Sequence, residues 1–432
     1  NGEASPMIEL KANLEHNIHM IICEMVELLF NCFNGTQFFK EYDEYQALVQ
    51  QQPDLDSEEL MFIEDVINEN IGKDITIERD KESKNYKLKI GKQDLIGTNR
   101  ENMELSTGEQ NFISLSFELL LARHSDKEYI IMDDPISSFD SVYKNKIAFC
   151  IIKFLENKKQ IVLTHNTDLI RLLDVQLNNC FNLYILNNVE NGDNGFIMVS
   201  DLEKKLLINL HELIMFFQNK KGYLKSAIHD RRLFLMSMIP FMRGYAHVSL
   251  DLDDDFGRLS NIMHGYGTGT IDVAAMYRKQ FGFDFGMEEQ VSVEDVLSLN
   301  CDELDIIDKN QYPLMGNTLE QTLIYYHLRM IVEKKLVELF SIEVKDDTLS
   351  QIIQKAFCSR DGERDFEEKR KFRVFFTSRK TLLNEFNHFE GNMNIFQPAI
   401  DITYQSLKKE ISDIQEELEK VRLFVEKQHN SL

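Results

Sequence analysis

The string YIIMDDP, residues 129–135, decides the fold of this chain. Four apolar residues closed by two acids and a proline are typical of a short buried strand. A second predicted strand, residues 160–163, follows a helical pattern. The order strand, helix, strand predicts a parallel sheet with crossover helices.

Toward the N-terminus the pattern is first helical and then alternating. Apolar residues at helical spacing over 7–50 predict a long helix or a helical hairpin. We expect Asn1–Pro6, which precede the first Met, to lie outside the natural sequence. Alternation over 74–95 predicts a β-hairpin, and residues 105–123 return to helical spacing.

Toward the C-terminus two further strands, 182–186 and 196–199, precede a long helical region. Stretches at 251–272 and 288–308 are expected to interrupt that region, and residues 404–428 predict an amphipathic helix. The predicted fold class is therefore α/β plus all-α. The predicted domains are 7–200 and 201–432.

Composition excludes several classes of protein. The 432 residues are 43% hydrophobic, which suits two or three domains with buried cores. No apolar run is long enough for a spanning helix or a secretory signal, so we expect a cytoplasmic protein without a membrane partner. The six cysteines form no C-x-x-C pair, which favours reduced thiols over a zinc site. A formal charge of −24 argues against indiscriminate coating of nucleic acid, so any contact with it should be local.

Several short motifs follow one another in the first half. The string LSTGEQ, residues 105–110, opens a predicted helix whose start could face an anion, although a capped helix without function would look the same. Asp133 and Asp134 end the first strand, SSFD at 137–140 follows, and His165 comes just after the next strand. A carboxylate at such a strand end can hold Mg²⁺, and a second acid can orient an attacking water.

These motifs in this order resemble the C-terminal half of an ABC-type ATPase head, with its signature motif, Walker B strand, D-loop and switch histidine. The resemblance implies a site for ATP, or GTP or dTTP, with Mg²⁺ held by Asp133. The residues that it implies at the nucleotide are Ser106, Gly108, Glu109, Gln110, Asp133, Asp134, Asp140 and His165.

The chain departs from that family in one respect. It contains no G-x-x-x-x-G-K-[ST] string, the phosphate loop of such heads. We therefore expect a composite site completed by a Walker A-bearing lobe or subunit, and no ATP hydrolysis by this chain alone. That lobe is expected on a removed segment or a separate polypeptide, rather than lost through decay, because the acids and His165 remain. Signature motifs normally work across an interface, which favours a homodimer or higher oligomer.

The second half offers polar residues one helical turn apart. Arg329 and Glu333 share a helix face, as do Asn384 and His388 in an otherwise apolar stretch. Taken singly, these would be an ordinary ion pair and a satisfied core histidine. Together with the first half they resemble the PrrC- and RloC-type anticodon nucleases, which join an ABC head to a helical HEPN-type ribonuclease domain.

That resemblance implies a toxin of anti-phage defence that cuts tRNA at the anticodon loop. Its catalytic set would be Arg329, Glu333 and His388, supported by Asn384. A metal-independent ribonuclease needs a group to take the 2′-OH proton, an acid for the 5′-oxygen and a cation for the developing charge. The imidazole with the carboxylate, and the guanidinium, would supply these and leave a 2′,3′-cyclic phosphate.

Further residues are candidates with plainer interpretations. A basic cluster precedes Asn384 and could bind RNA, or could be a solvated helix face: Lys369, Arg370, Lys371, Arg373, Arg379 and Lys380. Two other pairs, Arg243 with His247 and Arg258 with His264, loosely resemble the Arg-to-His spacing of HEPN ribonucleases, although such spacings are common by chance.

Two alternatives to the nuclease remain open at this point. The chain could be an ABC-type sensor or scaffold in a defence complex, whose helical half binds a regulatory or effector partner. It could also be a DNA-end-binding ATPase of the repair type, which should carry a long coiled coil; the short opening helix argues against that class.

Overall fold

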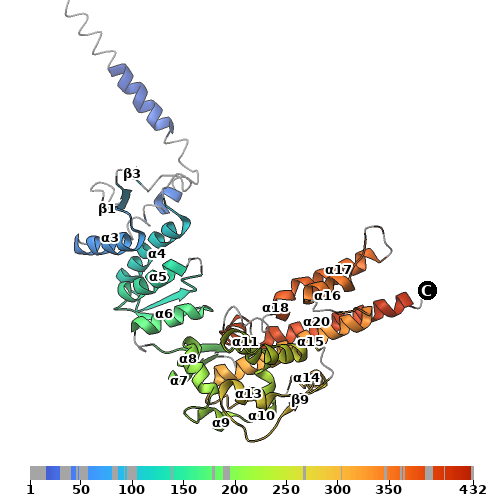
Figure 1. Ribbon diagram of the computed structural model, residues 1–432. Coiled ribbons are helices and arrows are strands. Elements are labelled where there is room, and N and C mark those ends of the chain that lie inside the picture. The colour runs from blue at the N-terminus through green and yellow to red at the C-terminus, as the bar shows by residue number, and fades with distance from the viewer. Residues whose placement is uncertain are drawn as a thin grey trace, which may run out of the picture. The chain divides into compact units, whose positions relative to one another are not determined.

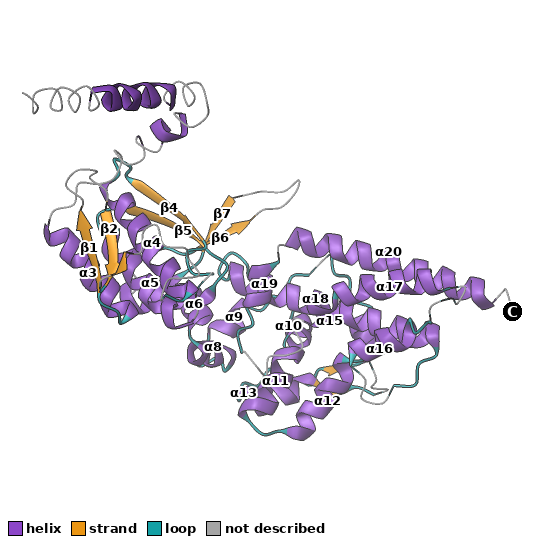
Figure 2. Cartoon of the chain, turned by 90° about the horizontal axis from the view of Figure 1, so that it is seen from above, coloured by secondary structure: helices purple, strands orange, loops and turns teal. Residues whose placement is uncertain are grey.

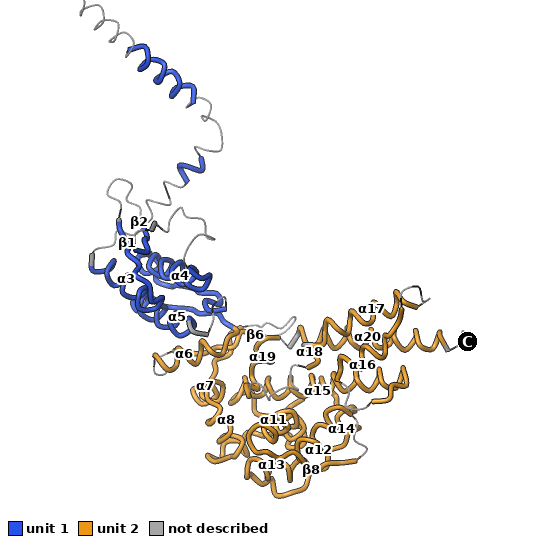
Figure 3. The backbone as a smooth tube through the Cα atoms, turned by 45° about the horizontal axis from the view of Figure 1, so that its top comes forward, with its two compact units in different colours: residues 1–164 blue, residues 165–432 orange. Residues whose placement is uncertain are grey.

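The computed structural model divides the chain into two compact units, residues 1–164 and 165–432 (Figure 3). The predicted domain boundary at residue 200 stays a prediction, because compactness alone does not define a domain. The structure describes residues 16–29, 40–44, 47, 57–79, 86–91, 93–94, 105–137, 139, 141–177, 181–187, 195–265, 269–302, 304–344, 348–360, 362, 365–384, 393–402 and 404–429.

In the first unit a helix packs against a small antiparallel sheet (Figure 1). Helix α3 spans Ser57–Ile71, and the sheet has the order β1 (Ile75–Arg79), β2 (Tyr86–Ile90), β3 (Gln93–Asp94). Ile75 pairs with Ile90 and Ile77 with Leu88, so the apolar residues of both strands lie on one face. The predicted hairpin over 74–95 is confirmed.

The same unit contains the parallel strand pair that the sequence predicts. Helix α4 (Thr107–His124) leads to β4 (Tyr129–Asp133), and helix α5 (Ser141–Phe154) leads to β5 (Lys159–Leu163). The two strands pair in parallel, from Tyr129 opposite Lys159 to Asp133 opposite Leu163. Figure 2 shows the two arrows side by side. The carboxyl ends of both strands therefore meet at one edge, where Asp133 and Asp134 lie.

One face of this strand pair is apolar and exposed. Ile131 and Ile161 are register partners, with 65% and 43% of their surfaces exposed. Tyr129 and Leu163 are also exposed, at 53% and 40%. Parallel sheets are normally covered on both faces, so this face has the character of one that packs against further structure.

The predicted helix over 7–50 is confirmed where the structure describes it. Residues 16–29 are helical, with exposed apolar side chains, and residues 40–44 are helical as well. The other parts of that prediction, apart from residue 47, lie outside the described residues.

The second unit begins with α6 (Thr167–Leu177) and an antiparallel pair, β6 (Tyr184–Asn187) with β7 (Gly195–Met198). The strand pair predicted at 182–186 and 196–199 is thus confirmed within a residue or two. Helices then follow: α7 (Asp201–Ile208), α8 (Leu210–Phe217), α9 (Tyr223–Ala227), α10 (Arg231–Ser237) and α11 (Ile239–Ser249).

The expected interruption at 251–272 is wrong for half of its length. Helix α12 occupies Asp253–Met263, because three acids fill its first turn, where the helix dipole favours them, and Leu259, Ile262 and Met263 are buried. Helix α13 (Val273–Phe281) lies in the sequence between two short strands, β8 (Ile271–Asp272) and β9 (Gln290–Val291), which pair with each other. The acidic stretch from 288 also forms α14 (Val293–Leu297).

A long buried helix, α15 (Pro313–Phe340), organises the rest of the unit. It contacts α10, α14, α16 (Leu349–Ala356), α18 (Lys380–Asn384), α19 (Gln397–Asp401) and α20 (Tyr404–His429). Its N-terminal part belongs to one apolar core and its C-terminal part to a second, which also takes in α17 (Phe366–Ser378). Helix α20 confirms the predicted amphipathic helix. No helix in the described parts of the chain is long and apolar enough to span a membrane.

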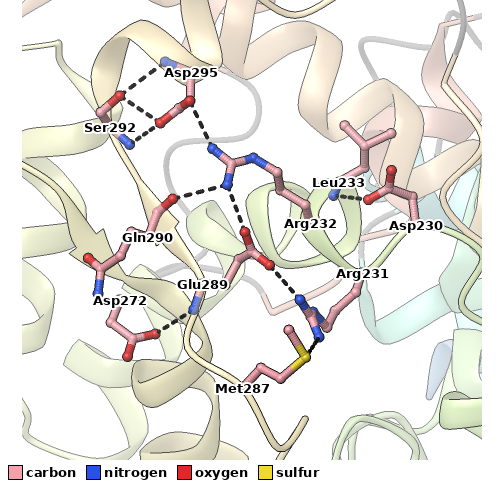
Figure 4. A network of polar contacts seen from close by, with 10 residues as sticks. All are labelled: Asp230, Arg231, Arg232, Leu233, Asp272, Met287, Glu289, Gln290, Ser292 and Asp295. Carbon is pink, nitrogen blue, oxygen red and sulfur yellow. Dashed lines mark hydrogen bonds and ion pairs between the residues drawn. The ribbon is translucent and has the colours of Figure 1, made fainter.

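A polar network fixes α14 beside α10 (Figure 4). The carboxylate of Glu289 accepts from Arg231 at 2.9 Å and from Arg232 at 2.7 Å. Arg232 also pairs with Asp295 at 2.8 Å. The hydroxyl and N–H of Ser292 bond the Asp295 carboxylate, and these bonds, with Arg232, hold its pKa below the usual value despite partial burial. These contacts tie the start of α14 to α10.

Candidate functional site

The start of α4 is a well-formed helix cap. Ser106 is the N-cap, its hydroxyl accepts from the N–H of Glu109, and the Glu109 carboxylate accepts from the N–H of Ser106 at 2.6 Å. Burial raises the pKa of Glu109, but the bonds from Ser106 and the ammonium of Lys73, 3.4 Å away, outweigh it and lower the pKa overall. Both predicted residues thus serve the cap in this conformation.

Gly108 and Gln110 lie in the first turn of the same helix. A Cβ at position 108 would stand 3.3 Å from the ring of Tyr143 on α5, so glycine allows α4 and α5 to approach closely here. The Gln110 amide donates to the carbonyl of Leu105 at 3.0 Å. The turn is therefore held by its own side chains, with its first N–H groups directed along the helix axis toward its N-terminal side.

The two acids at the end of β4 occupy different settings. Asp133 is exposed, whereas Asp134 has φ +46° and accepts from the hydroxyls of Ser137 and, at 3.1 Å, Thr164. The backbone N–H of Asp134 also bonds Leu163 at 2.7 Å. Hydroxyl donors on both oxygens hold the Asp134 carboxylate in one orientation, while Asp133 is open to a ligand.

This donor set fits Mg²⁺ with a nucleotide. Mg²⁺ is usually bound by one or two carboxylates together with phosphate oxygens and waters. Asp133 can supply one carboxylate at the sheet edge. In the described residues, no cluster of three or more His, Cys, Asp or Glu side chains could hold a metal by itself. A metal here would therefore need the phosphates.

The remaining residues of the predicted nucleotide site are placed in part. Asp140 lies outside the described residues. His165 begins the second unit with an exposed side chain, and its backbone carbonyl accepts from the amide of Gln397 at 3.1 Å.

In the second unit, Arg329 and Glu333 form a buried pair on α15. The guanidinium donates to Glu333 Oε1 from Nε at 3.2 Å and from Nη2 at 2.9 Å. The side chains are 4% and 0% exposed. A surface pair at this spacing contributes only tenths of a kcal/mol, but two buried charges depend on one another. This pair is therefore not the ordinary surface ion pair that the spacing alone allows.

His264 completes this cluster from the end of α12. Its Nδ1 lies 3.3 Å from Glu333 Oε2 and 3.3 Å from Arg329 Nη2. A guanidinium and a protonated Nδ1 are both donors, and a carboxylate can accept from both. With its proton on Nδ1 the ring donates to Glu333, and with its proton on Nε2 the ring accepts from Arg329 at Nδ1. In the first of these tautomers Nε2 is the acceptor of the ring, and the side chain is 24% exposed.

Asn384, at the end of α18, closes the cluster from another side. Its Oδ1 accepts from Arg329 Nη1 at 2.5 Å. The structure thus brings together three of the four residues of the predicted catalytic set, and adds His264. The fourth, His388, lies outside the described residues.

Of the two other Arg and His pairs, only His264 takes part in this cluster. Arg243 is buried, donates to Ser260 at 2.8 Å and lies over the ring of Phe256. His247 stacks on the same ring and pairs loosely with Asp253 at 3.8 Å. Of the second pair, Arg258 is exposed on α12, and only His264 reaches Arg329 and Glu333.

The basic cluster is partly neutralised by its own surroundings. Lys369 pairs with Asp365 at 2.7 Å, Arg370 with Glu367 at 2.9 Å, and Arg379 with Glu410 at 2.6 Å. The other three basic residues have no carboxylate partner in the described part of the chain: Lys371, Arg373 and Lys380. The local positive charge is therefore smaller than the sequence suggests.

Comparison with known proteins bears on the first half of the chain. Residues 41–231 match the family model of an AAA domain. This match supports an ATPase-like, nucleotide-binding region, and agrees with the mixed α/β character of that part. No curated protein matches the chain.

Proposed function

We propose that this protein is a nucleotide-regulated ribonuclease that cuts RNA by metal-independent attack of a 2′-OH, with tRNA as the expected substrate. The observation that carries the proposal is the cluster of Arg329, Glu333 and His264. A buried cation and carboxylate meet a partly exposed imidazole there, and this combination serves acid–base chemistry on a phosphodiester.

The residues divide the work as follows. His264 Nε2, with Nδ1–H held by Glu333, takes the proton of a ribose 2′-OH as the 2′-oxygen attacks the adjacent phosphorus. The bond from phosphorus to the 5′-oxygen breaks, and that oxygen needs a proton from a second acid, a role we assign to His388. The products are a 2′,3′-cyclic phosphate and a free 5′-hydroxyl.

In this scheme Arg329 supports His264 through Glu333 and through its positive charge. Its guanidinium is 4% exposed and bonds Glu333 and Asn384, so it orients the carboxylate. Its positive charge, held in a medium of low dielectric, also favours negative charge developing on the phosphate near His264.

Nucleotide would act in the first half of the protein through a composite site. Asp133 would hold Mg²⁺, which neutralises phosphate charge when bound, and Asp134 would orient water. The absence of a phosphate loop from the sequence supports a requirement for a Walker A-bearing lobe. The exposed apolar face of β4 and β5 supports a partner that covers it. Pairing of two such heads and a role in anti-phage defence are parts of the same proposal.

The test is the chemistry of the cut. The protein is incubated with total tRNA in the presence of nucleotide and Mg²⁺, and the new ends are analysed. We expect cyclic phosphate and 5′-hydroxyl ends, and loss of cleavage when the ribose at the cut carries 2′-deoxy. Products with 5′-phosphate, or undiminished cleavage of the deoxy substrate, would contradict this mechanism.

The alternative function, a sensor or scaffold, predicts a different result. If the helical half only binds a partner, no RNA is cut in any nucleotide condition, with or without the Walker A-bearing lobe.

A further inference from the structure

A cavity of about 340 Å³ lies between α15, α20 and the loop after α14. This volume is at the lower end of small-molecule sites, which run from about 300 to about 1,000 Å³. Part of its lining consists of branched aliphatic side chains, which suit a flat apolar group: Leu299, Ile324, Leu328, Leu407 and Ile411. No part of the RNA-cleaving scheme uses this cavity.

His327 supplies the one buried polar ring of the cavity wall. Its Nδ1 lies 2.7 Å from the carbonyl of Val296, and a carbonyl can only accept, so Nδ1 carries a proton. Burial lowers the pKa of His327, although the bond to Val296 opposes this, so the ring is neutral at pH 7. Nε2 is then an acceptor, and no group of the described chain bonds it.

The position of that acceptor is fixed. Val296 belongs to α14, which the network of Arg232, Glu289 and Asp295 ties to α10 (Figure 4). His327 is itself nine-tenths buried on α15. An acceptor held in a fixed position can take an N–H from a ligand that enters the cavity.

The rim of the cavity offers a cation. Lys408 Nζ lies 3.3 Å from Asp302, and the side chains are 50% and 80% exposed. Such an exposed pair is weak, so the ammonium can turn to a stronger anion. Asn300, Ser412 and Gln415 add amide and hydroxyl groups nearby.

We propose that this cavity binds a nucleobase, held between the aliphatic walls with an N–H donated to His327 Nε2 and with the attached phosphate near Lys408. Every nucleobase has an N–H on its pairing edge, so the geometry selects the class rather than one base. The base can belong to a free mononucleotide or to single-stranded RNA. The proposal does not depend on RNA cleavage.

Cys301 provides a direct probe because it lines the cavity. Burial, with a contribution from Asp302, raises the pKa of its thiol to about 11, so alkylation is followed at alkaline pH by mass spectrometry. Cys358 is exposed and serves as the internal reference. AMP, adenosine, ribose 5-phosphate, a short RNA and the same RNA with an abasic position are compared.

We expect AMP at ten times its dissociation constant to slow alkylation of Cys301 about tenfold, with Cys358 unchanged. Ribose 5-phosphate should not protect. Protection by the intact RNA alone would identify an RNA base as the ligand, and protection by AMP alone a free nucleotide. Protection by the base-free ligands equal to that by the base-bearing ones, or no protection at all, would overturn the proposal.

A rim variant tests the role of the phosphate without touching the core. Lys408→Glu should reduce protection by AMP to the level of adenosine, while Lys409→Glu, on an exposed neighbour that does not line the cavity, should leave it unchanged. Equal loss in both variants would show a general charge effect and contradict the assignment of Lys408.

Discussion

Glu203 lies on α7, and its buried carboxyl contacts the first turn of α15. This contact predicts how the stability of the protein depends on pH. The side chain is 0% exposed, and its Oε1 accepts from the N–H of Met315 at 2.6 Å. Oε2 has no partner in the described structure. Because α15 also holds Arg329 and Glu333, this contact anchors the helix on which the candidate site is built.

The magnitude follows from the pKa. Burial raises the pKa of Glu203 from 4.5 to about 7, although the N–H groups of Met315 and Leu314 lower it. A shift of this size corresponds to about 3 kcal/mol. The pKa of Glu203 is higher in the folded protein than in the unfolded chain. Its contribution to the free energy of unfolding is therefore fully present below about pH 4.5 and is lost as the pH rises through about 7.

Glu203→Gln keeps the acceptor and removes the titration. We expect the variant to match the unaltered protein near pH 4.5, and to be more stable by as much as about 3 kcal/mol above pH 7. The assay is urea unfolding of the full chain at a series of pH values, scored on the transition of the second unit.

Glu212→Gln is the matched control, because Glu212 lies on the next helix in a partly exposed pair with Lys221. It should shift stability by less than about 0.5 kcal/mol at every pH. A stability difference between Glu203→Gln and the unaltered protein that does not grow with pH would refute the argument.

Three further predictions concern other parts of the protein. Ser106→Ala removes the acceptor for the N–H of Glu109 and should cost the first unit about 1 kcal/mol in urea unfolding; no change would mean that the cap contributes nothing. Arg329→Met or Glu333→Met alone should cost about 3–5 kcal/mol, and the double variant much less than the sum; additive costs in a double-mutant cycle would argue against a coupled pair. The isolated chain should release no phosphate from ATP, and robust turnover by it would contradict the composite nucleotide site.

Local patterns in the sequence predict the elements that depend on neighbouring residues. The strands β4 and β5 are recognisable because each contains a short apolar run, and Asp133 follows from its place at a strand end. The helix α12 is missed because three consecutive Asp residues suggest a loop, whereas in the structure they stabilise a helix start.

The site is harder to predict because its contacts are distant in sequence. The four-residue spacing of Arg329 and Glu333 places them on one face, but their burial depends on packing by the whole unit. Asn384 and His264 reach Arg329 across 55 and 65 residues. The sequence offers the Arg258 and His264 spacing as a signal, but it pairs His264 with the wrong arginine.

The measurement that tests the central claim most directly is the rate of RNA cleavage by His264→Ala beside His247→Ala. Both change a partly exposed histidine of the same unit, but only His264 contacts Arg329 and Glu333. We predict that His264→Ala lowers the rate by at least about 100-fold, the usual share of a general acid or base, while His247→Ala retains it. Equal rates for the two variants would contradict the claim that Arg329, Glu333 and His264 form one working site.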